Sequence, residues 1–552
     1  MVNEITQFPN DKRIDALKNC FNKKVCYFKF KEKRIGRLDY MTEAKEVSTY
    51  LGKRLGTEKI TDKKIDPEQL KKFSLEEYRN ISAMDLAQKV RDGLVTKEQL
   101  IDYALAVIEE TNSELNNVIS LRVEKARKEA AEMEDTGQPF YGVPLLVKGM
   151  GHEIAGESNT FGLSFTEEFI ADETSSFVEE FRKAGFIILG QTSFPQFAWI
   201  NVTTSDLYGP TRNPWNVEHN PGGSSGGSTA AVAAGQVPIA TSSDAGGSIR
   251  IPASFSGLVG HFPTRGILGE DEEVQTNQTA NFVNTKTMKD TEVMFNHLLK
   301  DKFKEGSDTL PKNKIDKETI IAYTLQTPAG TPLSDEAREA IKNAVAFVEE
   351  QGFKTQEVDY PIDGEKMMMQ YYVIAASATA GLDELTPTFL QRTLQEEDVE
   401  LLTWGLYQLN QKSSEEKVNK AWETLHEMEE KVVEFYEKYP IFLTPTTAYP
   451  APEADYHHIP DELRPALKDM SELDFEESLQ LIYDQWLPAW VKTPYTQLSN
   501  LTGTPSISLP THVTKEGLPL GIMFGATHYD DYRLLEIGKL FEENNQFKLL
   551  TF

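Results

Sequence analysis

Residues 220–253 read NPGGSSGGSTAAVAAGQVPIATSSDAGGSIRIPA, two Gly-Ser clusters set among apolar segments. A flexible linker requires low hydrophobicity along its whole length. Here TAAVAAGQVPIAT (229–241) follows the first cluster, and its Ala-rich start predicts a buried helix. The second cluster runs into SIRIPASFSGLVG (248–260), which is half apolar. Because a chain that buries both flanks also holds the part between them, we interpret this stretch as ordered backbone rather than a tether.

The same stretch does not contain a phosphate-binding loop. That loop requires Gly-x4-Gly-Lys-Ser/Thr, and GGSSGGST (222–229) has no lysine at the required place. A second interpretation is a backbone that approaches a ligand closely. The successive N–H groups of DAGGS (244–248) could converge on a developing oxyanion, beside a serine able to attack the carbonyl. A structural glycine turn explains the same letters, and the residues alone leave both interpretations open.

Length and composition indicate a large globular protein. The chain has 552 residues, of which 39% are hydrophobic and 26% charged. No run approaches the roughly eighteen apolar residues of a membrane helix, and the first residues lack the apolar core of a secretory signal. Two cysteines, Cys20 and Cys26, are too few for a disulfide framework or a four-ligand zinc site. We therefore expect a cytoplasmic protein.

Charge divides the chain into two parts. Residues 1–72 contain 18 Lys/Arg and 11 Asp/Glu, whereas the rest contains 39 basic and 75 acidic residues, for a total net charge of −29. The asymmetry predicts a separate N-terminal extension over 1–73 and a second unit over 74–552. A helix-like start and two strand-like runs make the extension a small α+β or helical unit. The extension is either a docking or nucleic-acid module or a solvated appendage that neutralises the acidic body. A strongly negative body repels phosphate backbones, so we expect no nucleic-acid partner.

Alternating helix and strand patterns predict an α/β fold. The amphipathic segment 174–185 is followed at once by the apolar run FIILG (186–190), which is half of a βαβ unit, and 319–360 repeats the alternation. The segment 360–480 is predicted to be mainly helical, and 503–526 returns to strands. We expect a large domain with a mixed β-sheet covered by helices on both faces.

Several separated motifs together resemble the amidase signature family of hydrolases over roughly residues 75–545. The two central motifs are GGSSGGS (222–228) and DAGGSIRIPA (244–253). The supporting segments are GVPLLVKG (142–149), YGPTRNPW (208–215), GLVGHFPTRG (257–266), TPTTAYPAP (444–452) and NLTGTPSISLP (500–510). Within the family the motifs look most similar to 6-aminohexanoate-cyclic-dimer hydrolases and to aryl or peptide amidases. The resemblance makes 74–552 the amidase domain.

The resemblance implies a Ser-Ser-Lys triad. Ser248 matches the nucleophile, Ser224 the bridging serine, and Lys148 the general base. A serine hydroxyl needs a base to take its proton, and a lysine can do so only when burial lowers its pKa. The family pattern also implies a cis peptide bond between Gly223 and Ser224.

Further residues match supporting positions of the family. The backbone N–H groups of the second cluster match the oxyanion hole, and neighbouring side chains match residues that orient the loops. The oxyanion residues are Ala245, Gly246, Gly247 and Ser248; the supporting residues are Gly223, Ser225, Asp244 and Arg250. Asp244 is interpreted as the residue that holds the glycine turn.

Two letters depart from the family pattern, and the histidines offer no clear alternative site. Gly149 follows Lys148 where the family usually has Asp. Phe262 replaces the usual Lys before Pro-Thr, and we interpret that change as local to the surface.

His261 is a weak candidate for a Ser-His-Asp mechanism, and the adjacent His457 and His458 are expected to pack or face solvent. We expect no metal and no cofactor.

The sequence thus predicts an amidase that hydrolyses the amide C–N bond of a small substrate through an acyl-enzyme. One alternative is the glutaminase subunit of a tRNA-dependent amidotransferase, and another is a catalytically silent binding protein on the same scaffold. We expect a small-molecule amide as partner and no membrane, and we leave a homodimer open.

Overall fold

The structure is a computed structural model that describes residues 65–269, 277–305 and 308–552. Most of the expected N-terminal extension, residues 1–64, lies outside the described residues, so its fold stays a prediction. The first described helix, α3 (Pro67–Lys72), begins just before the expected boundary at residue 74. Within the described ranges no helix is both long and apolar enough to cross a bilayer.

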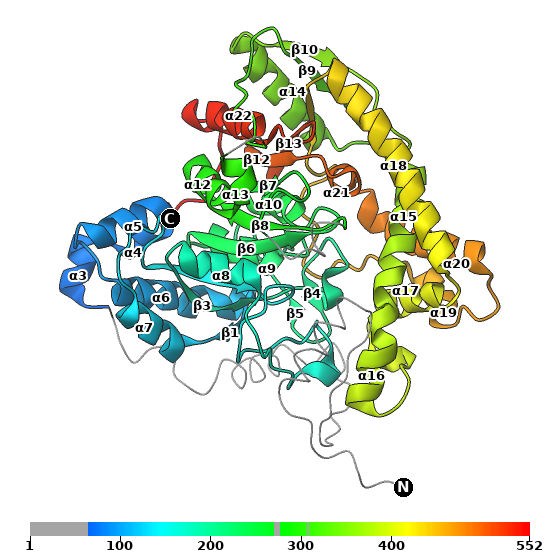
Figure 1. Ribbon diagram of the computed structural model, residues 1–552, viewed down its shortest axis with the longest axis horizontal. Coiled ribbons are helices and arrows are strands. Elements are labelled where there is room, and N and C mark those ends of the chain that lie inside the picture. The colour runs from blue at the N-terminus through cyan, green and yellow to red at the C-terminus, as the bar shows by residue number, and fades with distance from the viewer. Residues whose placement is uncertain (1–64, 270–276, 306–307) are drawn as a thin grey trace.

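One mixed sheet runs through the centre of the molecule (Figure 1). In the described residues it has eleven strands, in spatial order β1 (Val118–Leu121), β3 (Phe186–Thr192), β2 (Val143–Lys148), β6 (Ile239–Asp244), β8 (Ala280–Thr285), β7 (Val259–Phe262), β12 (Ser506–Val513), β13 (Pro519–Ala526), β11 (Ile441–Pro445), β9 (Ile320–Tyr323) and β10 (Lys354–Glu357). Strand pairs β2–β3, β2–β6, β9–β10 and β9–β11 are parallel, and the others are antiparallel. A short hairpin, β4 (Thr204–Ser205) with β5 (Gly209–Pro210), stands apart from it.

Helices cover both faces of this sheet, as expected. On β7 a Cβ at Gly260 would lie 2.7 Å from the Ala253 Cβ of α10 (Arg250–Ser256), whereas the ring of His261 contacts the ring of Phe295 in α12 (Met288–Leu298). Successive side chains of a strand point to opposite faces, so α10 and α12 lie on opposite sides of the sheet. The other helices around the sheet are α4 (Leu75–Asn80), α5 (Ala83–Arg91), α6 (Lys97–Leu115), α7 (Val123–Glu132), α8 (Ser176–Lys183), α9 (Gly226–Ala233), α13 (Asp301–Lys304), α14 (Asp335–Glu350), α21 (Gln497–Thr502) and α22 (Asp531–Glu543).

The two predicted βαβ patterns are confirmed. Helix α8 joins β2 to β3, and α14 joins β9 to β10, each pair being parallel. A complete capping box opens α6, because Thr96 Oγ1 accepts from the Gln99 N–H and the Gln99 side chain accepts from the Thr96 N–H. At α4, Ser74 caps the helix but the Glu77 carboxylate pairs with Lys89 instead.

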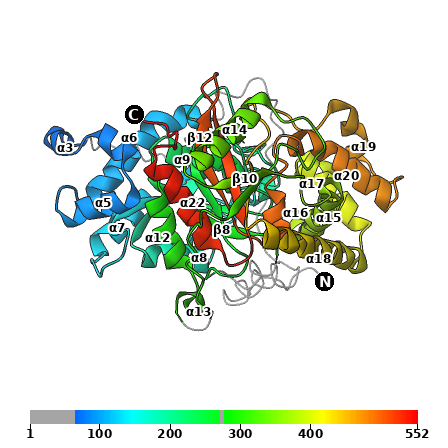
Figure 2. The same ribbon diagram turned by 90° about the horizontal axis from the view of Figure 1, so that it is seen from above.

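The stretch after residue 360 forms a helical layer beside the sheet, at the end opposite α3–α7 (Figures 1 and 2). Its helices are α15 (Gly364–Ser377), α16 (Leu382–Leu390), α17 (Leu401–Gln411), α18 (Glu415–Lys438), α19 (Arg464–Lys468) and α20 (Phe475–Trp490). All of them except α16 share a second hydrophobic core built on Tyr372, Leu406, Val432 and Ile482. Helix α16 instead packs Leu382 and Leu385 against Phe161 and Phe169. Strand β11 interrupts this layer and joins the sheet between β13 and β9.

Candidate active site

Neighbouring strands of the sheet bring the motif residues together. Lys148 is the last residue of β2, and β6, which pairs with β2 in parallel, ends at Asp244. Ser248 lies in the loop between β6 and α10. Ser224 lies in the loop before α9, and its peptide bond with Gly223 is cis. Two loops and one strand end therefore meet at one edge of the sheet.

Lys148 contacts two serines. Its Nζ lies 2.8 Å from Ser224 Oγ and 2.8 Å from Ser243 Oγ, and the lysine is fully buried. Burial lowers the pKa of Lys148 from 10.5 to about 7, although the Asp244 carboxylate acts in the opposite direction. Near neutral pH a large fraction of this lysine is therefore the neutral amine, the form that can accept a proton.

The glycine turn after β6 is held by Asp244. The Gly247 N–H donates to Asp244 Oδ1 at 2.6 Å, and the Ile249 N–H donates to Oδ2 at 3.0 Å. On the other side of the turn, the Gly246 carbonyl accepts from Thr496 Oγ1 and from Gln497 Nε2, each at 2.9 Å. The Gly246–Gly247 peptide is thus held at both ends, because a planar peptide carries its C=O and N–H on opposite sides.

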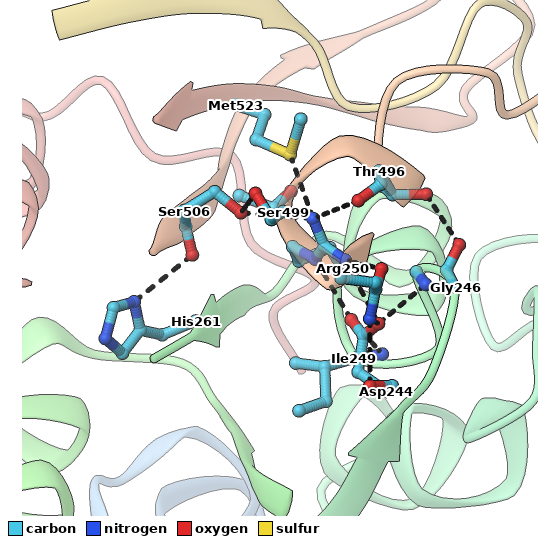
Figure 3. Close-up of polar contacts among 12 residues, drawn as sticks. Asp244, Gly246, Ile249, Arg250, His261, Thr496, Ser499, Ser506 and Met523 are labelled. Atoms are coloured by element: carbon cyan, nitrogen blue, oxygen red, sulfur yellow. Dashed lines mark hydrogen bonds and ion pairs between the residues drawn. The ribbon is translucent and has the colours of Figure 1, made fainter. Parts of the chain in front are cut away.

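Behind the turn lies a buried ion pair between Asp244 and Arg250 (Figure 3). Arg250 Nε and Nη2 donate to the two carboxylate oxygens at 3.0 Å each. Arg250 Nη1 also donates to the Thr496 carbonyl at 2.7 Å, which ties the turn to the start of α21. Burial by itself would raise the pKa of Asp244, but the Arg250 guanidinium and further hydrogen bonds outweigh it and hold that pKa below its usual value.

A pocket opens in front of the turn. Gly223, Ala245, Gly246 and Ser248 line it on one side, and Ser248 is half-buried there. The opposite walls come from the segment 198–201, from α15 and α20, and from residues 493–497; their larger side chains are Trp199, Met368, Tyr371, Trp486, Trp490 and Gln497. None of the lining residues in the described chain carries a charge. The pocket is therefore uncharged and largely aromatic.

Three of the four expected oxyanion amides remain unengaged. Within the described residues, the N–H groups of Ala245, Gly246 and Ser248 donate to no other group of the chain. The Gly247 N–H differs, because Asp244 accepts from it. We therefore remove Gly247 from the expected donors and assign its amide to the turn.

Ser225, expected as a supporting residue, makes one side-chain hydrogen bond near the site. Ser225 is fully buried, and its Oγ donates to the Ser243 carbonyl at 3.2 Å, so it links the Ser224 loop to β6. Ser243 itself was not among the expected residues, although its Oγ contacts Lys148. Its position one residue before Asp244 on a strand was the only signal in the sequence that could have indicated it.

The two departures from the family pattern now have structural reasons. Phe262 is buried, and its ring lies 4.7 Å from the guanidinium carbon of Arg250, so the expectation of a surface change was wrong. An aromatic face held against a buried cation contributes a cation–π interaction. At Gly149 a Cβ would lie 2.7 Å from Phe194 and 2.9 Å from Ile119, so this chain has no room for an aspartate there.

The histidine candidates do not reach the pocket. His261 is fully buried, and its ring lies between the Ser506 carbonyl and Asp531, on the face of β7 away from α10. His458 is half-buried in the loop between β11 and α19, and desolvation lowers its pKa to about 3. No group of three or more metal-binding side chains occurs within the described ranges.

Tertiary contacts add residues that the motifs did not indicate. Tyr371 places its hydroxyl 2.7 Å from the position of a Cβ on Gly246, which explains why a glycine is needed there. Asn500 Nδ2 donates to Asp244 Oδ1 at 2.8 Å, and Thr496 and Gln497 hold the Gly246 carbonyl. Asn500 begins a segment that we noted as family-like, but nothing in the sequence assigned it to this loop.

The large mixed sheet with helices on both faces, and a site at the end of its central strands, define an α/β enzyme. The chain belongs to the amidase family, whose model, described as Amidase, matches residues 99–535. Members of this family hydrolyse amides, so the protein is an amide-hydrolysing enzyme. The family predicted from the motifs is confirmed.

Individual relatives agree with this assignment. The chain is 46% identical to a lipoamidase of Enterococcus faecalis over 86% of its own length, and it spans 65% of that relative's length. It is 29% identical to the 6-aminohexanoate-cyclic-dimer hydrolase of Paenarthrobacter ureafaciens, covering 83% of this chain and 93% of the relative. A solved structure of 6-aminohexanoate cyclic dimer hydrolase matches with a TM-score of 0.72 and 28% identity, covering 84% of this chain and 96% of the other. The motifs alone did not indicate the lipoamidase, which is the more similar of these two enzymes.

Proposed function

We propose that the protein hydrolyses an uncharged carboxamide through an acyl-enzyme on Ser248, with Ser224 and Lys148 as the proton relay. Ser248 Oγ attacks the carbonyl carbon while its proton passes to Ser224 Oγ and the Ser224 proton passes to Lys148 Nζ. The C–N bond then breaks as the leaving nitrogen receives a proton by the reverse route. Water hydrolyses the resulting ester and returns the Ser248 hydroxyl.

The observation that carries this proposal is the contact between Lys148 and Ser224. The 2.8 Å separation lies within hydrogen-bond reach, and the pKa of about 7 suits a base that works near neutral pH. The N–H groups of Ala245, Gly246 and Ser248 would stabilise the oxyanion. Preorganised donors of this kind are each worth about 3–4 kcal/mol of barrier.

The pocket supports an apolar or mildly polar acyl group. Its aromatic walls would bury hydrocarbon or cyclic-disulfide surface, at about 25 cal/mol per Å² of apolar area. Because 46% of aligned residues are shared with a lipoamidase, we propose a lipoyl-type amide as the preferred substrate. The absence of charged lining residues in the described chain speaks against free glutamine, whose ammonium and carboxylate groups would need partners. The glutaminase alternative is therefore not favoured.

The test combines active-site labelling with a substrate panel. A fluorophosphonate probe should label Ser248, as read by peptide mass spectrometry. Turnover of lipoamide, lipoyl-lysine, an anilide, a cyclic amide and glutamine should rank the lipoyl amides first and glutamine last. An adduct on another residue would refute the assignment of Ser248 as the nucleophile. Glutamine as the best substrate would refute the proposal that lipoyl-type amides are preferred.

A further inference from the structure

One wall of the pocket is built from two amide side chains that meet at Thr493. Asn201 and Gln497 both line the pocket, although they come from segments nearly three hundred residues apart. Asn201 Nδ2 donates to Thr493 Oγ1 at 2.8 Å, and Gln497 Nε2 donates to the Thr493 carbonyl at 3.1 Å. Gln497 Nε2 also donates to the Gly246 carbonyl, so this wall adjoins the glycine turn that carries Ser248.

The hydrogen bonds show which atom of each side-chain amide, in Asn201 and in Gln497, has no partner. Gln497 donates to two carbonyls, and Asn201 donates to the Ala489 carbonyl at 2.9 Å as well as to Thr493. A carbonyl oxygen can only accept, so each side-chain nitrogen faces these partners and each side-chain oxygen faces elsewhere. Asn201 Oδ1 and Gln497 Oε1 are both buried, and within the described residues neither accepts a hydrogen bond.

Two buried acceptors without partners are costly. A buried polar group left unpaired costs about 1–3 kcal/mol, and almost all such groups in folded proteins have a partner. Gln497 is 6% exposed, so its oxygen gains little from bulk water. Both oxygens have almost no accessible surface, so a ligand reaches them only after a small movement of the side chains. One N–H at this wall then gives one of the oxygens a full hydrogen bond, or both of them a shared, bifurcated one.

The proposed reaction supplies that donor. A primary or secondary amide held with its carbonyl carbon at Ser248 carries a donor beside the carbonyl, an N–H on the nitrogen of the bond to be cleaved, whereas a tertiary amide or an ester carries none. Building on the proposed function, we infer that Asn201 Oδ1 and Gln497 Oε1 accept from this N–H. They make the enzyme select primary and secondary amides over N-methylated amides and esters of the same acyl group.

The experiment compares three ligands that share one acyl group: a secondary amide, its N-methyl amide and the matching ester. kcat/KM is measured for the wild type, for Asn201→Leu, for Gln497→Met and for a control, Gln480→Met, which changes an exposed glutamine of α20. We expect the preference for the N–H amide over the N-methyl amide to fall about tenfold in each pocket variant, the size of one net hydrogen bond to a buried acceptor. The control should keep the wild-type preference.

The ratio of kcat/KM between substrates, taken within each variant, separates an effect on specificity from an effect on folding. A partly misfolded sample loses activity toward all three substrates by the same factor, so its ratio does not change. Asn201→Leu is the cleaner variant, since Asn201 does not bond to the glycine turn and Gln497 does. An unchanged ratio in both pocket variants, with an active wild type, would overturn the inference. A wild type that turns over none of the three and is not labelled at Ser248 would instead overturn the proposed function.

Discussion

The Nζ of Lys148 lies 2.8 Å from the Oγ of Ser224, although 76 positions separate the two residues in the chain. The end of a buried strand holds the lysine away from water, and the loop before α9 brings the serine to it. This one contact joins a lysine of lowered pKa to a hydroxyl that adjoins the pocket.

Ser248→Ala should abolish amide turnover. If Ser248 forms the acyl-enzyme, kcat falls about a thousandfold or more, because residues that act as a unit lose nearly all of their joint contribution when one is removed. Thermal unfolding should change little. Ser164→Ala, at an exposed serine, is the matched control and should keep full activity. Substantial turnover by Ser248→Ala would assign the nucleophile elsewhere.

The pH profile should report Lys148. Since the proposed base is the neutral amine, kcat/KM should rise with pH, with a midpoint near the pKa of about 7, and level off above it. Lys148→Met should lose activity at every pH. A flat profile from pH 5 to 9 in the wild type would rule out Lys148 as the base.

The same lysine should make folding stability depend on pH. Its pKa is about 7 when folded and 10.5 in the reference state, so between these values the unfolded chain binds the extra proton. Stability from this group therefore increases as pH rises from 7 to 10. Over that range the unfolding free energy of the wild type should increase relative to that of Lys148→Met. Denaturant titrations at pH 7 and pH 9 measure it, and a constant difference would contradict the lowered pKa.

Arg250→Met should be strongly destabilising. It leaves the buried Asp244 carboxylate without its partner, and breaking a buried ion pair in this way costs about 3–5 kcal/mol. Adding Asp244→Asn to the same chain should recover part of that loss, because the uncompensated charge is removed. Neither variant should be active, since the glycine turn loses its support. An equal loss of stability in the single and double variants would show that the charge is not the cause.

Gly149→Asp tests the departure from the family pattern. The new Cβ would lie 2.7 Å from Phe194, so the core must shift, at a cost of about 1–3 kcal/mol. Gly381→Ala is the control, because a Cβ there would meet nothing within 4 Å. The decrease in melting temperature should be confined to Gly149→Asp and should be relieved by the added substitution Phe194→Leu. Equal stability of Gly149→Asp and the wild type would show that the loop can accommodate the carboxylate.

Much of the fold could be predicted from periodicity. Helix α8 with strand β3, and helix α14 with strand β10, follow from amphipathic segments that run directly into strand patterns. Strand β11 could not be placed in the same way. It is a five-residue segment, IFLTP, inside a helical region, and its three apolar residues are compatible with either structure until neighbouring strands pair with it.

Some residues of the candidate site could be predicted from the sequence, and others could not. Lys148, Ser224, Ser248 and Asp244 stand within short motifs rich in glycine and serine, so the sequence alone indicated them as candidate site residues together with the family. Tyr371, Asn201 and Gln497 have no such motif, because the chemistry of a pocket wall depends on which distant segments pack beside it. Phe262 was misjudged for the same reason: burial against Arg250 is a property of the folded sheet and not of the residue. The sequence by itself determined the family and indicated the candidate reacting groups, and only the tertiary structure decided their surroundings, since hydrogen-bond partners and desolvation arise when remote segments meet.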